Sequence, residues 1–378
     1  MKIGGLIVAA GLSSRMKNFK PLMTIDDKPL ILHTIDSLRR SGIKDVCVVL
    51  GYRGEEIEKA LKDEGVTMVY NHKFRETSMY DSFKIGLEKI KDSCDAIAFT
   101  PADIGFVTKY TVDLLVEEMN RNKKSVVYSR FKGVKGHPTI ISAKCFDYLL
   151  NYSGEGGLKL ALTNMDEGSI ILDTPDKFVL LDTDTPDDFE RVKNYYENRN
   201  YLTEDECMDL LSYSNVPQNV VNHSKKVKEV ACDLAEAVNK ALGEPKIDIS
   251  LISSSALLHD IKRSEKKHAL EGAKFLDDLG YDKIAEIVKT HMTLDQEYED
   301  LLNENSILYL ADKLIYEDKF VGVENRFKNK IEKYKDDASV YQNVIKRYNA
   351  AVKIESNVVS NVGKDTYENL KIKWRDSL

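Results

Sequence analysis

Near its N-terminus the chain reads Leu6-Ile7-Val8-Ala9-Ala10-Gly11-Leu12-Ser13-Ser14-Arg15-Met16, and Lys20-Pro21-Leu22 follows. An apolar run thus leads into small residues, a pair of hydroxyls and two spaced cations. Small residues let backbone N–H groups approach phosphate oxygens closely, and the cations can neutralise a phosphate chain. The stretch therefore predicts a buried strand that ends in a phosphate-binding loop. It matches neither the dinucleotide motif GxGxxG nor the GxxxxGK[ST] loop.

The first 200 residues continue this alternation of strands and helices. Strands are expected at 2–9, 46–50, 67–70 and 96–100, and helices at 30–41, 55–62, 80–91 and 110–120. This order is typical of an α/β fold with a doubly wound, mostly parallel sheet. Four later runs are expected to extend or cover the sheet, at 125–128, 139–142, 169–173 and 178–181. A helix opened by Pro186 and capped by Thr185 would end this part at about residue 198.

Glycine and proline are unevenly distributed along the chain. Of the 20 glycines 15 precede Tyr201, as do 6 of the 8 prolines, and no proline follows Pro245. Because both residues disfavour helix interiors, the second half is predicted to be almost entirely helical. Helices are expected at 204–214, 218–241, 249–259, 267–279, 282–290, 306–316, 338–356 and 366–374. We therefore expect an α/β domain over 1–199 and an all-α domain over 200–378, joined by the polar segment 197–205.

The overall composition excludes several classes of protein. Lys and Arg together number 55 and Asp and Glu 62, so the formal net charge is −7. Such a chain is not expected to bind nucleic acid by bulk electrostatics. The five cysteines form no CxxC pair, which is typical of reduced thiols in the cytoplasm. No run approaches membrane-spanning length, so a cytoplasmic protein without a membrane partner is expected.

Further motifs follow the opening stretch in chain order. They are Gly51-Tyr52-Arg53, Asn71, Ser78-Met79-Tyr80-Asp81-Ser82, Thr100-Pro101-Ala102-Asp103, Gly136-His137-Pro138 and Asp182-Thr183-Asp184-Thr185-Pro186-Asp187-Asp188. Over nearly all of residues 1–200 this series resembles the nucleotidyltransferases that attach a nucleotide to molybdopterin. Ala9-Ala10-Gly11 and Gly136-His137-Pro138 are similar to the cytidylyltransferase branch. The resemblance thus implies CTP as the nucleotide, with GTP as the alternative, and molybdopterin as the acceptor.

The resemblance also assigns roles to residues. Nucleotide binding would fall to Ala9, Ala10, Gly11, Leu12, Ser13, Ser14, Arg15, Lys20, Gly51 and Ser82, and catalysis to Arg15, Lys20 and Asp103. Asp103, at the carboxyl end of a strand, would hold Mg²⁺, and Asp184, or Asp182 as the second candidate, would supply the other protein ligand.

The implied reaction is attack of an acceptor phosphate oxygen on the α-phosphorus of the nucleotide, with release of pyrophosphate. The apoenzyme of a molybdenum hydroxylase is a further implied partner. A sugar- or alditol-phosphate nucleotidyltransferase remains an open alternative.

The helical half contains four of the seven histidines. His223, the pair His259-Asp260 and Asp312 follow one another in an order that resembles the HD phosphohydrolase superfamily over about 217–316. The resemblance implies that these four residues bind a divalent transition metal, either Mn, Fe, Zn or Co. His268 and His291 would bind a second metal or contact substrate. A regulatory module without turnover is the alternative for this half.

Overall fold

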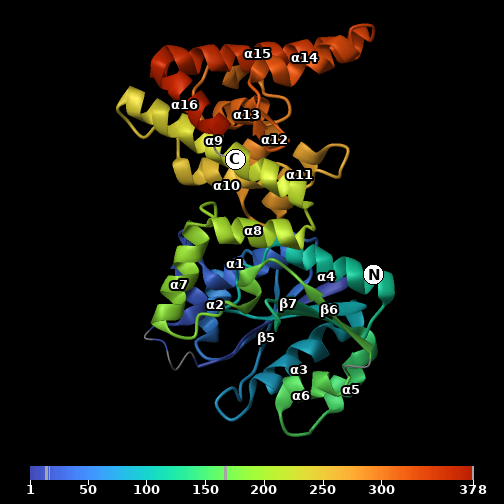
Figure 1. The fold of residues 1–378 in the computed structure, drawn as a ribbon. Coiled ribbons are helices and arrows are strands. Elements are labelled where there is room, and N and C mark those ends of the chain that lie inside the picture. The colour runs from blue at the N-terminus through green and yellow to red at the C-terminus, as the bar shows by residue number, and fades with distance from the viewer. Residues whose placement is uncertain (13–15, 17, 166–167, 377–378) are drawn as a thin grey trace. The chain divides into compact units, whose positions relative to one another are not determined.

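The computed structural model describes residues 1–12, 16, 18–165 and 168–376. It divides into two compact units, Met1–Asn198 and Arg199–Leu378, whose elements are labelled in Figure 1. Each unit has its own secondary structure and its own core, and each is described separately below.

The first unit contains a seven-stranded sheet in the order β5-β4-β1-β6-β8-β7-β9. Its strands are β1 (Ile3–Ala9), β4 (Val46–Leu50), β5 (Thr67–Tyr70), β6 (Ala96–Pro101), β7 (Val126–Phe131), β8 (Val134–Ser142) and β9 (Ser169–Asp173). β1 lies between β4 and β6 and is parallel to both, whereas β8 is antiparallel to its neighbours β6 and β7. The predicted doubly wound, mostly parallel sheet is confirmed.

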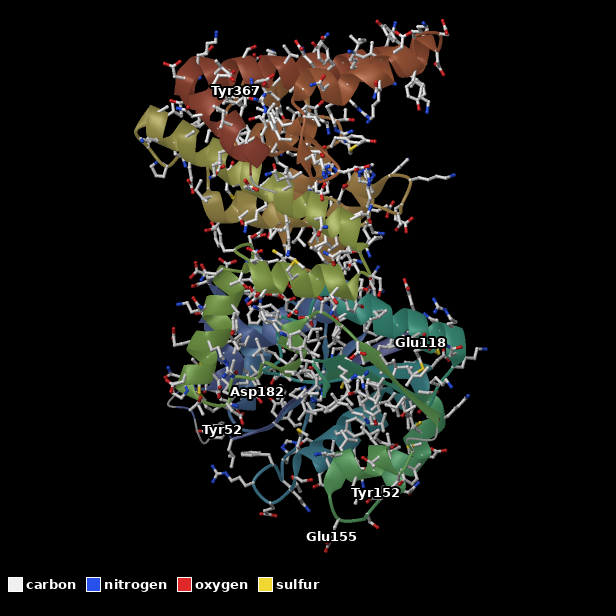
Figure 2. The ribbon with its side chains drawn as sticks, in the orientation of Figure 1. Tyr52, Glu118, Tyr152, Glu155, Asp182 and Tyr367 are labelled. Carbon is white, nitrogen blue, oxygen red and sulfur yellow. The ribbon has the colours of Figure 1, made fainter. Side chains whose placement is uncertain are left out.

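Helices cover both faces of this sheet, which is why its central strands are apolar throughout. In β1, Leu6 and Val8 belong to one core while Ile7 and Ala9 belong to the other, and Figure 2 shows side chains filling both layers. The helices are α1 (Leu30–Arg39), α2 (Gly54–Ala60), α3 (Met79–Ile90), α4 (Lys109–Asn122), α5 (Phe146–Asn151), α6 (Gly157–Thr163) and α7 (Pro186–Glu197). Between β1 and α1 lie a short 3₁₀ turn, η1 (Lys20–Leu22), and a two-stranded ribbon, β2 (Thr24–Ile25) with β3 (Lys28–Pro29).

One predicted strand of the first unit is wrong. Residues 178–181 were expected to be extended, but Lys177–Leu180 forms a 3₁₀ turn, η5. The buried carboxylate of Asp176 accepts hydrogen bonds from the backbone N–H of Phe178 and from Thr108 and Thr111. The turn places the Phe178 N–H over this carboxylate, and an extended chain would leave a buried charge with fewer donors.

The second unit is helical, as predicted. Its helices are α8 (Glu204–Tyr213), α9 (Gln218–Leu242), α10 (Ile249–Leu258), α11 (His268–Asp278), α12 (Asp282–Thr290), α13 (Glu304–Leu314), α14 (Val323–Lys333), α15 (Ala338–Val362) and α16 (Lys364–Asp376). Two features differ from expectation. A small antiparallel hairpin, β10 (Ile315–Tyr316) with β11 (Lys319–Phe320), follows α13, and α14 was not predicted. Among the described residues, no helix is both long and apolar enough to cross a membrane.

Candidate active sites

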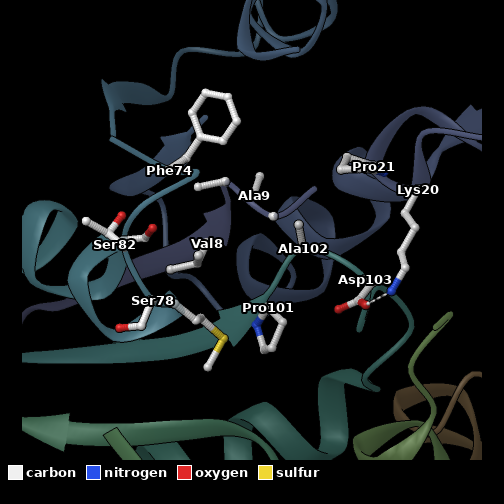
Figure 3. A pocket seen from close by; sticks show the side chains of 14 residues that line it. Val8, Ala9, Lys20, Pro21, Phe74, Ser78, Ser82, Pro101, Ala102 and Asp103 are labelled. Carbon is white, nitrogen blue, oxygen red and sulfur yellow. Dashed lines mark hydrogen bonds and ion pairs between the residues drawn. The ribbon is translucent and has the colours of Figure 1, made fainter. Parts of the chain in front are cut away.

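The first unit has a cleft at the carboxyl ends of β1 and β6 (Figure 3). Its lining includes Val8, Ala9, Ala10, Gly11, Lys20, Pro21, Phe74, Thr77, Ser78, Met79, Ser82, Pro101, Ala102 and Asp103. This edge is where parallel α/β sheets usually bind ligands. The structure therefore brings the predicted Ala9–Gly11 loop, Lys20, Ser82 and Asp103 to one cavity.

Gly51 has a different place from the other predicted nucleotide-binding residues. A Cβ atom at Gly51 would lie 2.7 Å from the carbonyl oxygen of Ala10, and the lining of the cleft does not include this glycine. Gly51 thus allows the connection after β4 to pack against the loop after β1. Leu12 is exposed, and the predicted residues Ser13, Ser14 and Arg15 lie outside the described residues.

The wall opposite Lys20 is built by the start of α3. The Ser78 hydroxyl accepts a hydrogen bond from the Asp81 backbone N–H, and the Asp81 carboxylate accepts one from the Ser78 N–H, which forms a capping box. The buried side-chain amide of Asn71 donates to Ser82 Oγ and to Thr77 Oγ1, each at 2.9 Å. Asn71 thereby fixes the loop between β5 and α3. Asn71 is part of the motif series in the sequence, but the sequence alone assigned it no role.

Lys20 lies between two of the predicted magnesium ligands. Its Nζ is 3.2 Å from Asp103 Oδ2 and also pairs with Asp184 Oδ1, and the first contact is drawn in Figure 3. Burial lowers the pKa of Lys20, but hydrogen bonds and charge from Asp184 and Asp103 outweigh burial and raise it. Burial, followed by the charges of Asp184 and Asp103, raises the pKa of Asp182. The site therefore holds crowded negative charge, which suits a divalent cation.

The three carboxylates do not converge as a trio. The described part of the chain has two tight groups of metal-ligating side chains, and neither includes Asp103, Asp182 or Asp184. Mg²⁺ usually takes one or two carboxylates plus phosphate oxygens and water, so a site of two carboxylates would be sufficient. Asp103 and Asp184 both contact Lys20. Lys20 occupies the space between them.

Both tight groups lie in the second unit. His223, His259 and Asp260 form one, and Asp260, His268 and His291 form the other, with ligand atoms within 4.8 Å of one another. In the first group His259 Nε2 is 3.6 Å from Asp260 Oδ2. In the second, Asp260 Oδ1 is 3.3 Å from His268 Nε2 and 3.5 Å from His291 Nε2. Asp260 therefore presents one carboxylate oxygen to each group.

Asp312 completes the first group from α13. Its Oδ1 lies 3.1 Å from His223 Nε2 and 3.9 Å from His259 Nε2. Its other oxygen pairs with Lys313, whose Nζ donates to the His291 carbonyl at 3.0 Å. All six predicted HD-domain residues are thus brought together. Lys313 was missed, because a lysine beside a candidate ligand has no distinctive spacing.

Two histidines have one ring nitrogen held by the backbone and the other available to a metal. Nδ1 of His259 donates to the Ala256 carbonyl and Nδ1 of His291 donates to the Val288 carbonyl, both at 2.7 Å. Because Nδ1 carries the proton, each Nε2 has a free lone pair, and both Nε2 atoms are buried without a hydrogen-bond partner in the described structure. Burial holds the pKa of His259 at about 4, so its ring is neutral at pH 7. A backbone carbonyl that orients the ligating imidazole is typical of protein metal sites.

Each of the two units contains a region that matches a known family model. Residues 5–168 match the model of the MobA-like NTP transferase domain, and residues 220–317 match the model of the HD domain. The chain thus contains a MobA-like NTP transferase domain followed by an HD domain.

Individual relatives resemble the MobA-like domain. The molybdenum cofactor cytidylyltransferase of Escherichia coli is 25% identical over 192 residues, which are 50% of this chain and 95% of that protein. The choline-phosphate cytidylyltransferase of Streptococcus pneumoniae is 30% identical over 93 residues, 23% of this chain and 41% of that protein. A solved nucleotidyl transferase from Methanothermobacter is 21% identical with a TM-score of 0.46, covering 52% of this chain and 98% of that one.

Proposed function

We propose that the MobA-like domain transfers CMP from CTP to molybdopterin and releases pyrophosphate. The observation that carries the transfer reaction is Lys20 held between Asp103 and Asp184 beside the Ala9–Gly11 loop. A cation and paired carboxylates at this edge suit the triphosphate of a nucleotide and its Mg²⁺. CTP is supported by two relatives that are named cytidylyltransferases.

The residues of the cleft would act by positioning and by neutralising charge. Backbone N–H groups around Gly11 would contact the phosphate chain, and Lys20 would turn from the carboxylates to the α-phosphate. The Ser82 hydroxyl accepts a hydrogen bond from Asn71. The hydroxyl proton of Ser82 can therefore be donated to a ligand in the cleft. Mg²⁺ held by Asp103 and Asp184 would add a Lewis acid for the departing pyrophosphate. The acceptor phosphate oxygen forms the new bond to the α-phosphorus, so no covalent enzyme intermediate is required.

The test is pyrophosphate release with CTP or GTP and three kinds of acceptor: molybdopterin, choline phosphate and a sugar phosphate. CTP with molybdopterin is expected to give the largest kcat/KM. Asp103→Asn should lower kcat at least ~100-fold, and Asp92→Asn, at an exposed site after α3, should leave it unchanged. Activity that survives Asp103→Asn would contradict the metal role, and preference for another acceptor or for GTP would replace the proposed substrate. Delivery to a molybdenum hydroxylase apoenzyme stays a prediction.

We further propose that the HD domain is a metal-dependent phosphohydrolase. This proposal is supported by two ligand groups that share Asp260 and by buried imidazole nitrogens without partners. A transition metal bound there would polarise a phosphate and lower the pKa of a water molecule. The chain's own residues would fix the ligand geometry, because Ala256 and Val288 orient two imidazoles and Lys313 holds Asp312.

Metal analysis of the purified protein tests this second proposal. Mn, Fe, Zn or Co is expected to copurify, and His259→Ala should lose it while the far-ultraviolet circular dichroism stays unchanged. His72→Ala removes an exposed histidine of the other unit and should keep the metal. A well-folded wild-type protein that binds none of these metals would refute the assignment. Metal binding without hydrolysis of any phosphate ester would favour the regulatory alternative.

A further inference from the structure

A pocket of about 640 Å³ opens beside the metal ligands of the HD domain. Its lining includes His223, Asp260 and Asp312. Helices α14 and α15 contribute Arg326, Lys330 and Arg347 to the same lining. The volume is in the range of sites that hold a small metabolite. The cations thus face a cavity that a ligand of the metal site would share.

These three cations lack acidic partners. In the part of the chain that the structure describes, Arg326, Lys330 and Arg347 form no ion pair. Arg326 Nε is buried without a hydrogen-bond partner, and its guanidinium lies 5.1 Å from the centre of the Tyr316 ring. Arg347 donates only to the neutral hydroxyl of Thr293, at 3.2 Å. A buried guanidinium nitrogen without an acceptor is costly, so an acceptor from a ligand would be strongly favoured.

The cations also repel one another. Burial, then Arg326, then Lys313, lowers the pKa of Lys330 to about 8. The charge of Asp312 opposes this shift but does not outweigh it, since Asp312 is also engaged by Lys313 and His223. Glu317 and Asp318 are exposed at the hairpin turn. Positive charge is therefore concentrated on the part of the pocket that α14 and α15 line, where an anion would stabilise it.

A substrate with a single phosphate would leave this positive side unused. Its phosphate would sit at the metal ligands, and Arg326, Lys330 and Arg347 would face its uncharged part. A second phosphate group provides several acceptor oxygens and matches the planar donor pattern of arginine.

We infer that the HD domain acts on an organic di- or triphosphate, an inference that rests on the proposed hydrolase function. One phosphate group would lie at the metal ligands and the next against Arg326, Lys330 and Arg347. Hydrolysis forms a bond from a water oxygen to phosphorus, breaks the bond from phosphorus to the leaving oxygen, and gives that oxygen a proton. Water is the only co-reactant.

Binding can be measured apart from catalysis. The probe is tripolyphosphate, titrated calorimetrically into full-length protein that carries Lys20→Ala to weaken the triphosphate site of the transferase, with EDTA present. Arg326→Gln should weaken binding about tenfold or more, since hydrogen bonds to charged groups contribute about 1.5–3 kcal/mol. Lys328→Ala, an exposed lysine of the same helix, is the matched control and should bind like the parent protein. Equal affinity in the Arg326→Gln and Lys328→Ala proteins would overturn the inference.

Catalysis provides the second test. Hydrolysis of the mono-, di- and triphosphates of one nucleoside is measured with the metal-loaded enzyme. The di- or triphosphate should have the higher kcat/KM, and Arg326→Gln should reduce that preference without changing the metal content. Preference for the monophosphate would overturn the inference. If no nucleotide is hydrolysed but tripolyphosphate binding still depends on Arg326, the hydrolase function fails and the anion pocket stands.

Discussion

Single residues set the electrostatics of both sites. In the transferase cleft, Lys20 supplies positive charge among three carboxylates. In the HD domain, Asp260 supplies negative charge to two groups of histidines, and His259 lowers the pKa of Asp260 despite its burial. Each site is therefore organised around one charged residue that contacts several others.

Gly51→Ala is expected to displace the phosphate loop. The added Cβ would lie 2.7 Å from Ala10 O and 2.8 Å from Ala10 Cβ, so backbone must move, at about 1–3 kcal/mol. Steady-state kinetics should show a higher KM for the nucleotide. Gly4→Ala, on β1, adds a Cβ at an ordinary 3.4 Å from Cys94 Sγ and should leave KM unchanged. An unaltered KM in Gly51→Ala would show that the loop does not depend on this contact.

Binding of tripolyphosphate by the HD domain is expected to weaken between pH 7 and pH 9. The free Lys330 has a pKa of about 8, and a bound anion would raise it, so the affinity is greatest at pH 7 and below and falls as the pH rises through 8. Arg326, Arg347, Lys313 and Asp312 are the charged groups around Lys330, and the two arginines stay charged over this range. Calorimetry on the Lys20→Ala protein across this range measures the effect. Lys330→Gln should flatten the profile, and an equally steep profile in that variant would refute the assignment.

At the scale of elements, helix termini position the functional groups. The capping box of Ser78 and Asp81 fixes the start of α3 at the cleft, and one of the same kind, Thr203 with Glu206, fixes the start of α8. In the HD domain, His259, His268 and His291 lie at the ends of α10, α11 and α12. Metal ligands at helix ends converge from several directions without interrupting the helices.

Ser78→Ala and Thr203→Ala form a matched pair of cap deletions. Each should lower the free energy of unfolding of its own unit by ~1 kcal/mol, as measured by urea denaturation. Ser78→Ala should also raise KM for the nucleotide, because Ser78 lines the cleft, whereas Thr203→Ala should not. Equal kinetic effects of the two variants would contradict the proposed position of the substrate.

Elements with strong apolar periodicity were predictable from the sequence, and weakly patterned ones were not. β1 and β4 are buried almost throughout, so composition alone revealed them. α14 was missed because only Val323 and Phe327 are buried among its charged residues. The turn at Lys177–Leu180 follows from the hydrogen-bonding demand of Asp176, which strand periodicity does not contain.

The sequence motifs identified most residues of the two sites, but they did not show how the atoms of these residues are arranged in space. The order of His223, His259, Asp260 and Asp312 could be recognised in the sequence. That Asp260 is shared between two groups of ligands depends on how five helices pack, which the sequence motif does not contain. Arg326 and Arg347 could not be linked to the site, since they lie beyond the motif and are brought to it by α14 and α15.

At the scale of the whole molecule, the two proposed activities belong to two units, each with its own core. The division lies between Asn198 and Arg199. Hydrophobic clusters of the first unit draw on residues between Ile3 and Tyr196, and the metal-ligating groups lie wholly in the second. Loss of one function should therefore leave the other intact.

Chelation is expected to destabilise only the HD domain. A metal present at 100 times its dissociation constant stabilises the state that binds it by about 2.7 kcal/mol. Scanning calorimetry of the full chain should show one transition that shifts down with EDTA and one that does not. Asp103→Asn should not alter the EDTA-sensitive transition, whereas His259→Ala should remove its sensitivity. A uniform shift of the whole profile would indicate a single cooperative unit.

The ion pairs of Lys20 also affect which ligands can enter the cleft. Before a nucleotide arrives, Asp103 and Asp184 already have a counter-ion, so binding is an exchange of partners rather than the filling of a bare site. A ligand can bind Lys20 only in competition with two carboxylates. Once Lys20 has left them, only a ligand that brings its own metal ion can neutralise the negative charge of those carboxylates. A triphosphate bound to Mg²⁺ meets both conditions. A metal-free monophosphate brings no ion to compensate the carboxylates, so in the proposed reaction the ion pairs of Lys20 would favour Mg²⁺-bound triphosphates over free monophosphates.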